Sequence, residues 1–221
     1  MSRGIKTIVC GATGIVGEGV LLECLSHPDV EQVLVINRKS SRRSHPKLRE
    51  IIHTDFFDLS AIESQLVGYD ACFFGRGVSS LDMSPEAYKR ITYDLTMNVR
   101  RLLAKLNPEM TFCYITGAGT DSSEQGRIGW ARVKGATENA LMKLFRSAYM
   151  FRPGFLKPTP GQKNLKSYYK FLAWVYPIGR VLYPAGFCTL QELGRAMINS
   201  VVKGCPKRIL EVRDIVNLAQ A

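Results

Sequence analysis

The sequence feature that most constrains the fold is an apolar run that breaks into three evenly spaced glycines. Residues 5–10 are rich in β-branched side chains, and the glycines follow with G-x-x-G-x-x-G spacing before a helical pattern begins. Such glycines permit a tight turn, let backbone amides approach a pyrophosphate and let helix and strand pack closely. The following helix N-terminus, with free amides and a positive dipole end, is an anion site. The residues predicted to bind the diphosphate of a dinucleotide are Gly11, Thr13, Gly14, Ile15, Val16 and Gly17.

The next apolar run strengthens this interpretation, since glycines alone are ordinary turn residues. Gln32–Ile36 has the composition of a buried parallel strand and completes a strand–helix–strand unit. After such a strand an acid would bind the ribose 2′-OH, whereas an Arg would accept a 2′-phosphate. These positions hold Asn37 and Arg38, and Lys39 follows. The sequence therefore favours NADP, with NAD as the alternative, and a solvated basic loop without a ligand is the remaining interpretation.

Length and charge are compatible with one nucleotide-binding domain. A chain of 221 residues can bury a sizeable core with a small appendage. The formal net charge of +11 suits an anionic partner, because a field of one sign concentrates the opposite charge. The basic residues are spread along the chain without a nucleic-acid-binding motif, so no nucleic-acid partner is expected.

Cysteine usage and the N-terminal residues predict a cytoplasmic protein without a metal site. The six cysteines form no C-x-x-C pair, several lie in apolar patterns, and the three histidines are scattered. Met1–Gly4 leads directly into the first predicted strand, without the apolar core of a signal peptide. No uncharged run reaches the roughly twenty residues that a membrane span requires, so no transmembrane segment is expected.

Strands and helices continue to alternate up to residue 155. Ser84 and Pro85 are typical of a helix start, and Asn107 with the following proline ends that helix. Alternation of this kind predicts an α/β fold, a Rossmann-type doubly wound parallel sheet with ligands at the carboxyl ends of the strands. The further strands are expected at residues 49–53, 69–74, 111–115 and 148–151, and the helices at 84–106 and 133–145.

Two of these strand ends carry further candidate cofactor residues. Asp55 follows the third strand and could accept from an adenine amino group, with Phe56 covering the ring. Capping of a helix that starts near Leu59 is an equally good interpretation of Asp55. After the fourth strand, Gly75 and Arg76 form a small-residue turn that lets the backbone approach the cofactor.

Four features together resemble the atypical, NAD(P)-dependent epimerase/dehydratase-like branch of the short-chain dehydrogenase/reductases. They are the glycine loop, Asn98–Val99, Val133–Gly135 and Arg152–Gly154. The pattern is most similar to the HIV Tat-interacting, oxidoreductase-like group. The resemblance covers about residues 5–155 and continues more weakly through residues 190–197. It implies that Lys134 holds the nicotinamide ribose and that Pro153 and Phe155 contact the cofactor.

One position departs from that family. The resemblance implies a catalytic Tyr four residues before Lys134, and this chain has Trp130 there. The spacing of four keeps both side chains on one helical face, but an indole cannot titrate near neutral pH. Thr116 or Ser122 could orient a substrate, although Thr116 could equally bond local backbone. The tyrosines that could supply a replacement phenol are Tyr93, Tyr168, Tyr169 and Tyr176.

The C-terminal residues form the second predicted region. We expect a Rossmann domain over residues 1–155 and a small substrate or lid region over 156–221, packed on the same domain. Residues 168–176 are an aromatic-rich helix candidate, interpreted as a lid over the substrate cleft. An interfacial membrane helix and a homodimer interface are the alternatives. Residues 190–203 are predicted to form a helix and 208–212 an edge strand.

Two functions follow from these residues. The first is an NADP(H)-dependent oxidoreductase acting on a small carbonyl or alcohol, with a different proton donor or a bound water in place of the Tyr. The second is a cofactor-bound regulatory or scaffold protein without turnover, which Trp130 favours. Lys134 and the glycine loop are compatible with both.

Overall fold

The computed structural model describes residues 3–78, 80–81, 83–165 and 168–221, and the side chains of residues 168–174 lie outside this description. A seven-stranded sheet forms its centre, with every pairing parallel. The order β3-β2-β1-β4-β5-β6-β9 reverses direction beside β1, which opens a crevice at the carboxyl ends of β1 and β4. The strands are β1 Ile5–Cys10, β2 Val30–Asn37, β3 Leu48–Ile52, β4 Ala71–Phe74, β5 Thr111–Ile115, β6 Ala148–Arg152 and β9 Ile209–Glu211.

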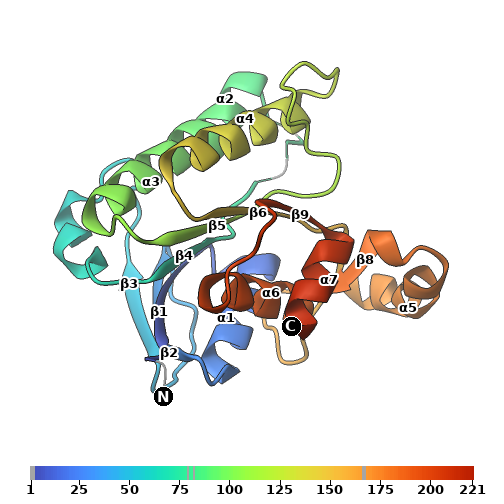
Figure 1. The fold of residues 1–221 in the computed structure, drawn as a ribbon, viewed down its shortest axis with the longest axis horizontal. Helices are drawn as coiled ribbons and strands as arrows, with labels where there is room; N and C mark the ends of the chain where they lie inside the picture. The colour runs from blue at the N-terminus through green and yellow to red at the C-terminus, as the bar shows by residue number, and fades with distance from the viewer. Residues whose placement is uncertain (1–2, 79, 82, 166–167) are drawn as a thin grey trace.

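Helices cover both faces of the sheet (Figure 1). Because side chains alternate along a strand, Ile8 packs into one core cluster and Val9 into the other. One face carries α1 Ile15–Ser26, α6 Leu190–Val202 and α7 Val212–Gln220. The other carries the 3-10 helix η1 Ser60–Leu66, α2 Pro85–Lys89, the π-helical turn η2 Arg90–Asp94, α3 Leu95–Leu106 and α4 Gly129–Leu144. The Rossmann-type α/β prediction is confirmed.

The predicted long helix exists, with an insertion that the sequence did not indicate. Ser84 accepts a hydrogen bond from the Ala87 amide at 3.2 Å and Pro85 occupies the first turn, as predicted. Between α2 and α3, however, the five residues of η2 form a π-helical turn. Such turns rotate the side chains around them and are frequent at functional sites. Here the turn places Tyr93 in the wall of a groove facing α4.

Residues after 155 contribute to the central layers as well as to an appendage. β9 lies at the edge of the main sheet beside β6, and α6 packs closely on α1, where a Cβ at Gly194 would lie 2.7 Å from Cβ of Glu23. The appendage comprises β7 Phe155–Lys157, α5 Tyr168–Leu182, the 3-10 turn η3 Pro184–Gly186 and β8 Phe187–Thr189. In Figure 1 α5 lies at the periphery, beyond β8. The helix at 190–203 and the edge strand at 208–212 are thus present as predicted.

The exposed side of α5 is apolar. Val181 and Leu182 are 79% and 78% exposed, and Ile178 is exposed as well. Its inner side joins Tyr176 to the rings of Phe155 and Phe187. Among the helices within the described residues, none combines the length and the apolar character needed to cross a bilayer.

Candidate cofactor-binding and catalytic site

The glycine loop between β1 and α1 depends on its missing side chains. Gly11 has φ +89°, and a Cβ there would lie 2.9 Å from the backbone nitrogen of Arg76. A Cβ at Gly17 would lie 2.2 Å from the Gly11 carbonyl oxygen, so helix and turn touch backbone to backbone. Gly14 is the N-cap residue and offers no side chain to the first helical amides. These amides therefore remain available to an anion at the positive end of the helix.

A cleft of about 260 Å³ opens directly above this loop. Its walls bring together Gly11, Thr13, Gly14, Asn37, Arg38, Phe56, Gly75 and Arg76, which are all among the predicted cofactor residues, with Ile36 and Gly77. The Arg76 guanidinium lies 4.1 Å from the centre of the Phe56 ring. Burial, together with the nearby charge of Arg38, lowers the pKa of Arg76. Two cations thus share a cleft in which no lining residue, of those described, is an acid.

Asn37 presents an unsatisfied oxygen at the end of β2. The residue is 2% exposed, and its Nδ2 is 3.4 Å from Glu50 Oε1, whereas Oδ1 is buried without a partner among the described residues. A buried acceptor without a donor costs free energy unless a ligand or water supplies one. Asn37 therefore has the chemistry to accept a hydrogen bond from a bound cofactor.

Glu50 on β3 organises the loop that carries Arg38. Its carboxylate accepts from the Ser40 hydroxyl and the Ser41 amide, each at 2.7 Å. Burial alone would raise the pKa of Glu50, but the bonds from Ser40, Ser41 and Asn37 lower it overall. The Glu50 carboxylate is consequently already hydrogen-bonded to this loop. Arg38 remains in the wall of the cleft.

The structure places Asp55 in a local turn. Its Oδ1 accepts from the Phe57 amide at 2.8 Å. The first residue of η1 is Ser60, whose amide donates to Asp58 rather than to Asp55, so the helix-capping interpretation of Asp55 is wrong. Asn98 of α3 donates to the carbonyls of Phe56 and Phe57 and so fixes this turn against the cleft.

A second, larger cleft continues from Arg38 toward the C-terminal region. Its volume is about 1040 Å³, and its walls include Thr13, Arg38, Lys39, Arg42, Lys163 and Asn164. The segment at Lys163 is tied to α1 by Glu18, whose buried carboxylate accepts from the amides of Lys163 and Asn164 at 2.8 and 2.9 Å and pairs with Arg43. Burial alone would raise the pKa of Glu18, but these bonds lower it overall. Glu18 therefore joins three segments around the cleft.

Trp130, Lys134 and Glu138 follow one another on the same face of α4. Lys134 Nζ donates to the Thr116 carbonyl at 2.6 Å and lies 5.8 Å from the centre of the Trp130 ring. Burial lowers the pKa of Lys134, and the Glu138 carboxylate opposes this in part. The predicted pair is thus brought together at the carboxyl end of β5, beside Gly117.

The two candidate hydroxyls are both bound by an ion pair that the sequence did not indicate. Thr116 Oγ1 donates to Glu138 at 2.6 Å, and Ser122 Oγ accepts from Arg152 at 2.5 Å. Glu138 is fully buried and pairs with Arg152, which also reaches Glu211 at 3.2 Å. Burial alone would lower the pKa of Arg152, but its two carboxylate partners raise it above its usual range.

The other candidate residues lie in different surroundings. The Pro153 carbonyl accepts from the Ala118 amide at 2.9 Å, which links β6 to the loop after β5. Phe155 belongs to the aromatic cluster with Phe187 and Tyr176, 5.3 and 6.3 Å away between ring centres. Tyr93 lies in the groove between α3 and α4, and the side chains of Tyr168 and Tyr169 lie outside the described residues.

Sequence reasoning missed three acids, namely Glu18, Glu50 and Glu138. Glu18 lies in an otherwise apolar and small-residue stretch of a helix, and Glu138 repeats the spacing of four from Lys134. That spacing was the available signal for Glu138. The partners of Glu18 and Glu50 come from other segments, so periodicity along the chain could not reveal them.

Several solved structures share this architecture, and some of them contain NAD. ADP-L-glycero-D-manno-heptose-6-epimerase of Helicobacter pylori superposes with a TM-score of 0.67 at 14% identity, over 99% of this chain and 82% of the epimerase. The shared fold is the Rossmann-like α/β fold with a parallel central sheet. WbmF of Bordetella bronchiseptica, in complex with NAD+, gives 0.66 at 17% identity over 99% of this chain and 77% of WbmF. The dTDP-glucose 4,6-dehydratase DesIV of Streptomyces venezuelae, with NAD bound, gives 0.68 at 15% over 97% and 80%.

The relatives found by sequence comparison are distant. No family model matches the chain. Protein FMP52, mitochondrial, of Candida albicans is 26% identical over 157 residues, which are 69% of this chain and 67% of that protein. The protein of the same name in Chaetomium globosum is 23% identical over 157 residues, or 68% and 66%. Both relatives are named as mitochondrial, so the expected cytoplasmic location is wrong; the absence of a signal-peptide core and the reduced cysteines did not distinguish the two compartments.

Proposed function

We propose that the protein binds a nicotinamide dinucleotide in the cleft above the glycine loop. The observation that carries this proposal is the set of unsatisfied groups in that cleft. Uncapped helix amides and two cations without an acidic partner lie at this cleft, and Asn37, whose buried Oδ1 has no partner among the described residues, lies in its wall. A diphosphate with its adenosine would satisfy all three. No metal is required by this arrangement.

NADP(H) fits the cleft better than NAD(H). Arg38 lies on the walls of both clefts, and Lys39, Arg42 and Lys163 extend the positive surface beyond it. A 2′-phosphate would find several cations there, whereas the 2′-OH of NAD would find no free acid, since Glu50 is already bonded to the loop. WbmF and DesIV carry NAD, so the preference rests on the residues of this chain.

For the reaction we propose hydride transfer to a small carbonyl, or from the corresponding alcohol. The nicotinamide would supply or accept the hydride. Lys134 would hold the nicotinamide ribose with its ammonium group, as the resemblance implies. Ser122, or Thr116 after exchange of its bond to Glu138, would orient the substrate oxygen, and a bound water would supply the proton, because the Trp130 indole only donates a hydrogen bond.

A second function is favoured by Trp130. The protein would then hold the cofactor as a regulatory or scaffold protein without turnover. Losing general acid–base catalysis costs about a hundredfold to ten-thousandfold in rate, whereas the binding cleft does not depend on Trp130. The resemblance to the HIV Tat-interacting group and a homodimer remain predictions under either function.

One experiment separates these functions. NADPH fluorescence is titrated with the purified chain, and a panel of small carbonyls is then screened for oxidation of the bound NADPH. Consumption by the wild type supports the oxidoreductase. Tight binding without consumption, together with activity that appears only in Trp130→Tyr, supports the second function. Absence of any binding of NADPH or NADH at micromolar concentration contradicts both.

We further propose a mitochondrial location, on the strength of the names of the two relatives. Fractionation of cells that express the full protein should recover it with the mitochondria. Recovery in the cytosolic fraction alone would contradict this proposal without bearing on cofactor binding.

A further inference from the structure

The larger of the two clefts beside Arg38, called the outer cleft below, has room for a ligand of its own. Its volume is about 1040 Å³, and small-molecule sites commonly have about 300–1,000 Å³. Of its described lining residues, Thr13 and Arg38 alone also line the cleft above the glycine loop. The others are Lys39, Ser40, Ser41, Arg42, Thr54, Lys163 and Asn164. A single phosphate group at Arg38 would therefore leave most of the outer cleft unfilled.

The outer cleft is positively charged, and its cations are accessible. They are Arg38, Lys39, Arg42 and Lys163, all four exposed, and none of the described lining residues is an acid. No salt bridge among the described residues involves any of the four. Lys163 Nζ donates to the Arg42 carbonyl at 3.1 Å, and an ammonium group has three donors, so it retains donors for a ligand.

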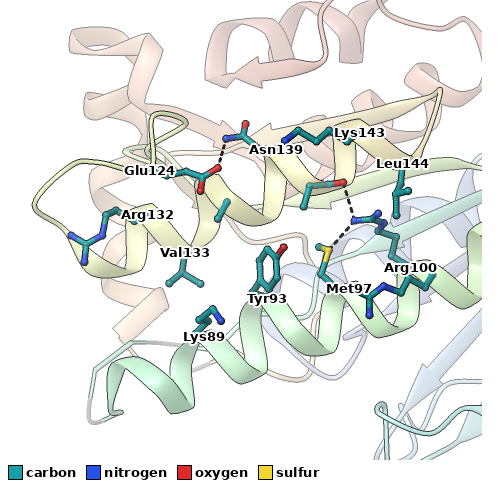
Figure 2. A pocket seen from close by; sticks show the side chains of 13 residues that line it. Lys89, Tyr93, Met97, Arg100, Glu124, Arg132, Val133, Asn139, Lys143 and Leu144 are labelled. Carbon is teal, nitrogen blue, oxygen red and sulfur yellow. Dashed lines mark hydrogen bonds between the residues drawn. The ribbon is translucent and has the colours of Figure 1, made fainter.

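A second basic surface, the groove between α3 and α4, differs in both respects (Figure 2). Its wall includes an acid, Glu124. Its residue Arg100 is 4% exposed, and Nη1 donates to the Ala140 carbonyl and the Met97 sulfur, each at 2.8 Å. That guanidinium is enclosed by protein and cannot reach a ligand. The cations of the outer cleft, in contrast, remain free to bind an anion.

The loop that carries these cations is held in shape by two acids. Arg42 has φ +52°, in the left-handed region that is uncommon for residues other than glycine, and its amide donates to Ser40 Oγ at 3.1 Å. Ser40 Oγ in turn donates to Glu50 at 2.7 Å, and the next residue, Arg43, pairs with Glu18. Residues in such conformations cluster at ligand sites, and a loop ordered in advance loses less freedom on binding. The two acids therefore stabilise the wall of the cleft without lining it.

We propose that the outer cleft binds a small metabolite that carries two or more phosphate groups, beside the cofactor and separate from it. A phosphate monoester carries a charge of about −1.5 to −2 near neutral pH, so one 2′-phosphate balances about half of the four cations. A second phosphorylated ligand would pair with the remaining cations, chiefly Arg42 and Lys163, and accept from the hydroxyls of Ser40 and Thr54. This inference goes beyond the proposed function, and the site does not need the cofactor in order to form.

Calorimetric titration of the full chain with pyrophosphate, in the absence of cofactor, tests the site. Pyrophosphate should bind about tenfold or more tighter than inorganic phosphate, because its two linked groups contact more cations, and added salt should weaken it. The double variant Arg42→Asn, Lys163→Gln should weaken binding by about tenfold or more, and Asn tolerates the left-handed backbone. The matched control Lys143→Gln, Arg213→Asn removes the same charge outside the cleft and should keep the affinity within about twofold.

Titrations with cofactor present separate this site from that of the cofactor. Pyrophosphate should still bind when NADH or NADPH is saturating, more weakly with NADPH because its 2′-phosphate also draws on Arg38. Strict competition with NADPH would assign the outer cleft to the 2′-phosphate, and strict competition with NADH would place pyrophosphate at the glycine loop. Either result overturns the proposal. Where neither cofactor binds, the proposed function fails, whereas the titration of the cofactor-free chain still decides on this site.

Two further outcomes would also overturn the proposal. One is the absence of pyrophosphate binding at about 1 mM, and the other is an equal loss of affinity in the two double variants. Thermal melts establish that both are folded. Lys39→Gln, an exposed single change in the same cleft, guards against a double variant that does not fold, and it should weaken pyrophosphate binding several-fold. Wild-type affinity in Lys39→Gln would contradict the site.

Discussion

The two ends of the predicted active site differ in how their polar groups are satisfied. At the cofactor end, uncapped helix amides, Arg38 and Arg76 lie at an open cleft, the Asn37 oxygen is buried beside it without a described partner, and none of the described lining residues is an acid. At the catalytic end, Thr116 and Ser122 are bonded to the buried Glu138–Arg152 pair. The cofactor end therefore has polar groups free to bind an anion, whereas most polar groups of the catalytic end are already bonded to one another.

This difference indicates how readily each end can bind a ligand or a substrate. Open, unsatisfied groups bind a ligand without first breaking an internal bond. Thr116 must exchange the bond that it donates to Glu138 before it can orient a substrate, whereas Ser122 accepts from Arg152 and keeps its own O–H as a donor. Because Trp130 also stands in place of a titratable group, the catalytic end is less suited to catalysis than the cofactor end is to binding a cofactor. The following variants test this contrast, in order of expected effect.

The largest effect is expected from Glu138→Gln. Removing the buried partner leaves Arg152 with only the half-exposed Glu211 carboxylate, and breaking a buried ion pair in this way costs about 3–5 kcal/mol of unfolding free energy. The matched control is Glu211→Gln, since Glu211 contacts the same Arg152 but its side chain is 53% exposed, so a loss of about 0–1 kcal/mol is expected. Urea denaturation measures both values. Equal losses in the two variants would show that the catalytic end is not held by the buried pair.

Gly17→Ala should damage the cofactor end next. The added Cβ would lie 2.2 Å from the Gly11 carbonyl oxygen, which must shift the glycine loop. Overpacking of this kind costs about 1–3 kcal/mol, so NADPH affinity should fall by roughly tenfold to a hundredfold in a fluorescence titration. Gly77→Ala is the control in the same cleft, because a Cβ there meets nothing within 4 Å. Unchanged affinity in Gly17→Ala would separate the loop from cofactor binding.

Arg38→Ala sharpens the comparison within the cofactor end. A hydrogen bond to a charged group contributes about 1.5–3 kcal/mol, so NADPH affinity should fall by roughly tenfold to a hundredfold while NADH affinity stays unchanged. Calorimetry with both cofactors measures the two affinities, and Arg213→Ala, on the distant helix α7, serves as the control. Equal affinity for the two cofactors before and after the change would rule out the 2′-phosphate argument.

The smallest effect concerns the pH dependence of the segment at Lys163. The folded-state pKa of Glu18 lies below its ordinary value of 4.5, so ionised Glu18 stabilises the fold above that value and the stabilisation is lost as the pH falls through the folded-state pKa. The wild type should therefore lose more unfolding free energy than Glu18→Gln between about pH 5 and about pH 3.

Hydrogen exchange gives a local check on the same variant. At neutral pH the amides of Lys163 and Asn164 should exchange faster in Glu18→Gln than in the wild type, since both donate to that carboxylate. Amides of β5, which is not adjacent to β1 in the sheet, should be unaffected. Identical exchange at Lys163 in both proteins would show that Glu18 does not hold this segment against the cleft.

Much of the fold and of the cofactor cleft could be predicted from local patterns. The strand–glycine–helix unit, Arg38 after β2, and Gly75 with Arg76 after β4 all lie where parallel strands end, so topology alone places them at one edge. The cap at Ser84 and the spacing of Trp130 and Lys134 were likewise visible, because both are set by residues three or four apart.

The sequence by itself determined the alternating layers, the glycine loop and the replacement at position 130, because each depends on neighbouring residues and on side-chain size. Only the tertiary structure decided which charged side chains are paired with a partner. Glu50 accepts a hydrogen bond from Ser40, Glu138 pairs with Arg152, and Glu18 accepts from the Lys163 amide. Arg100, in contrast, has no carboxylate partner among the described residues. The physical reason is that an ion pair depends on distance in space, and in this fold the partners come from separate strands, helices and loops.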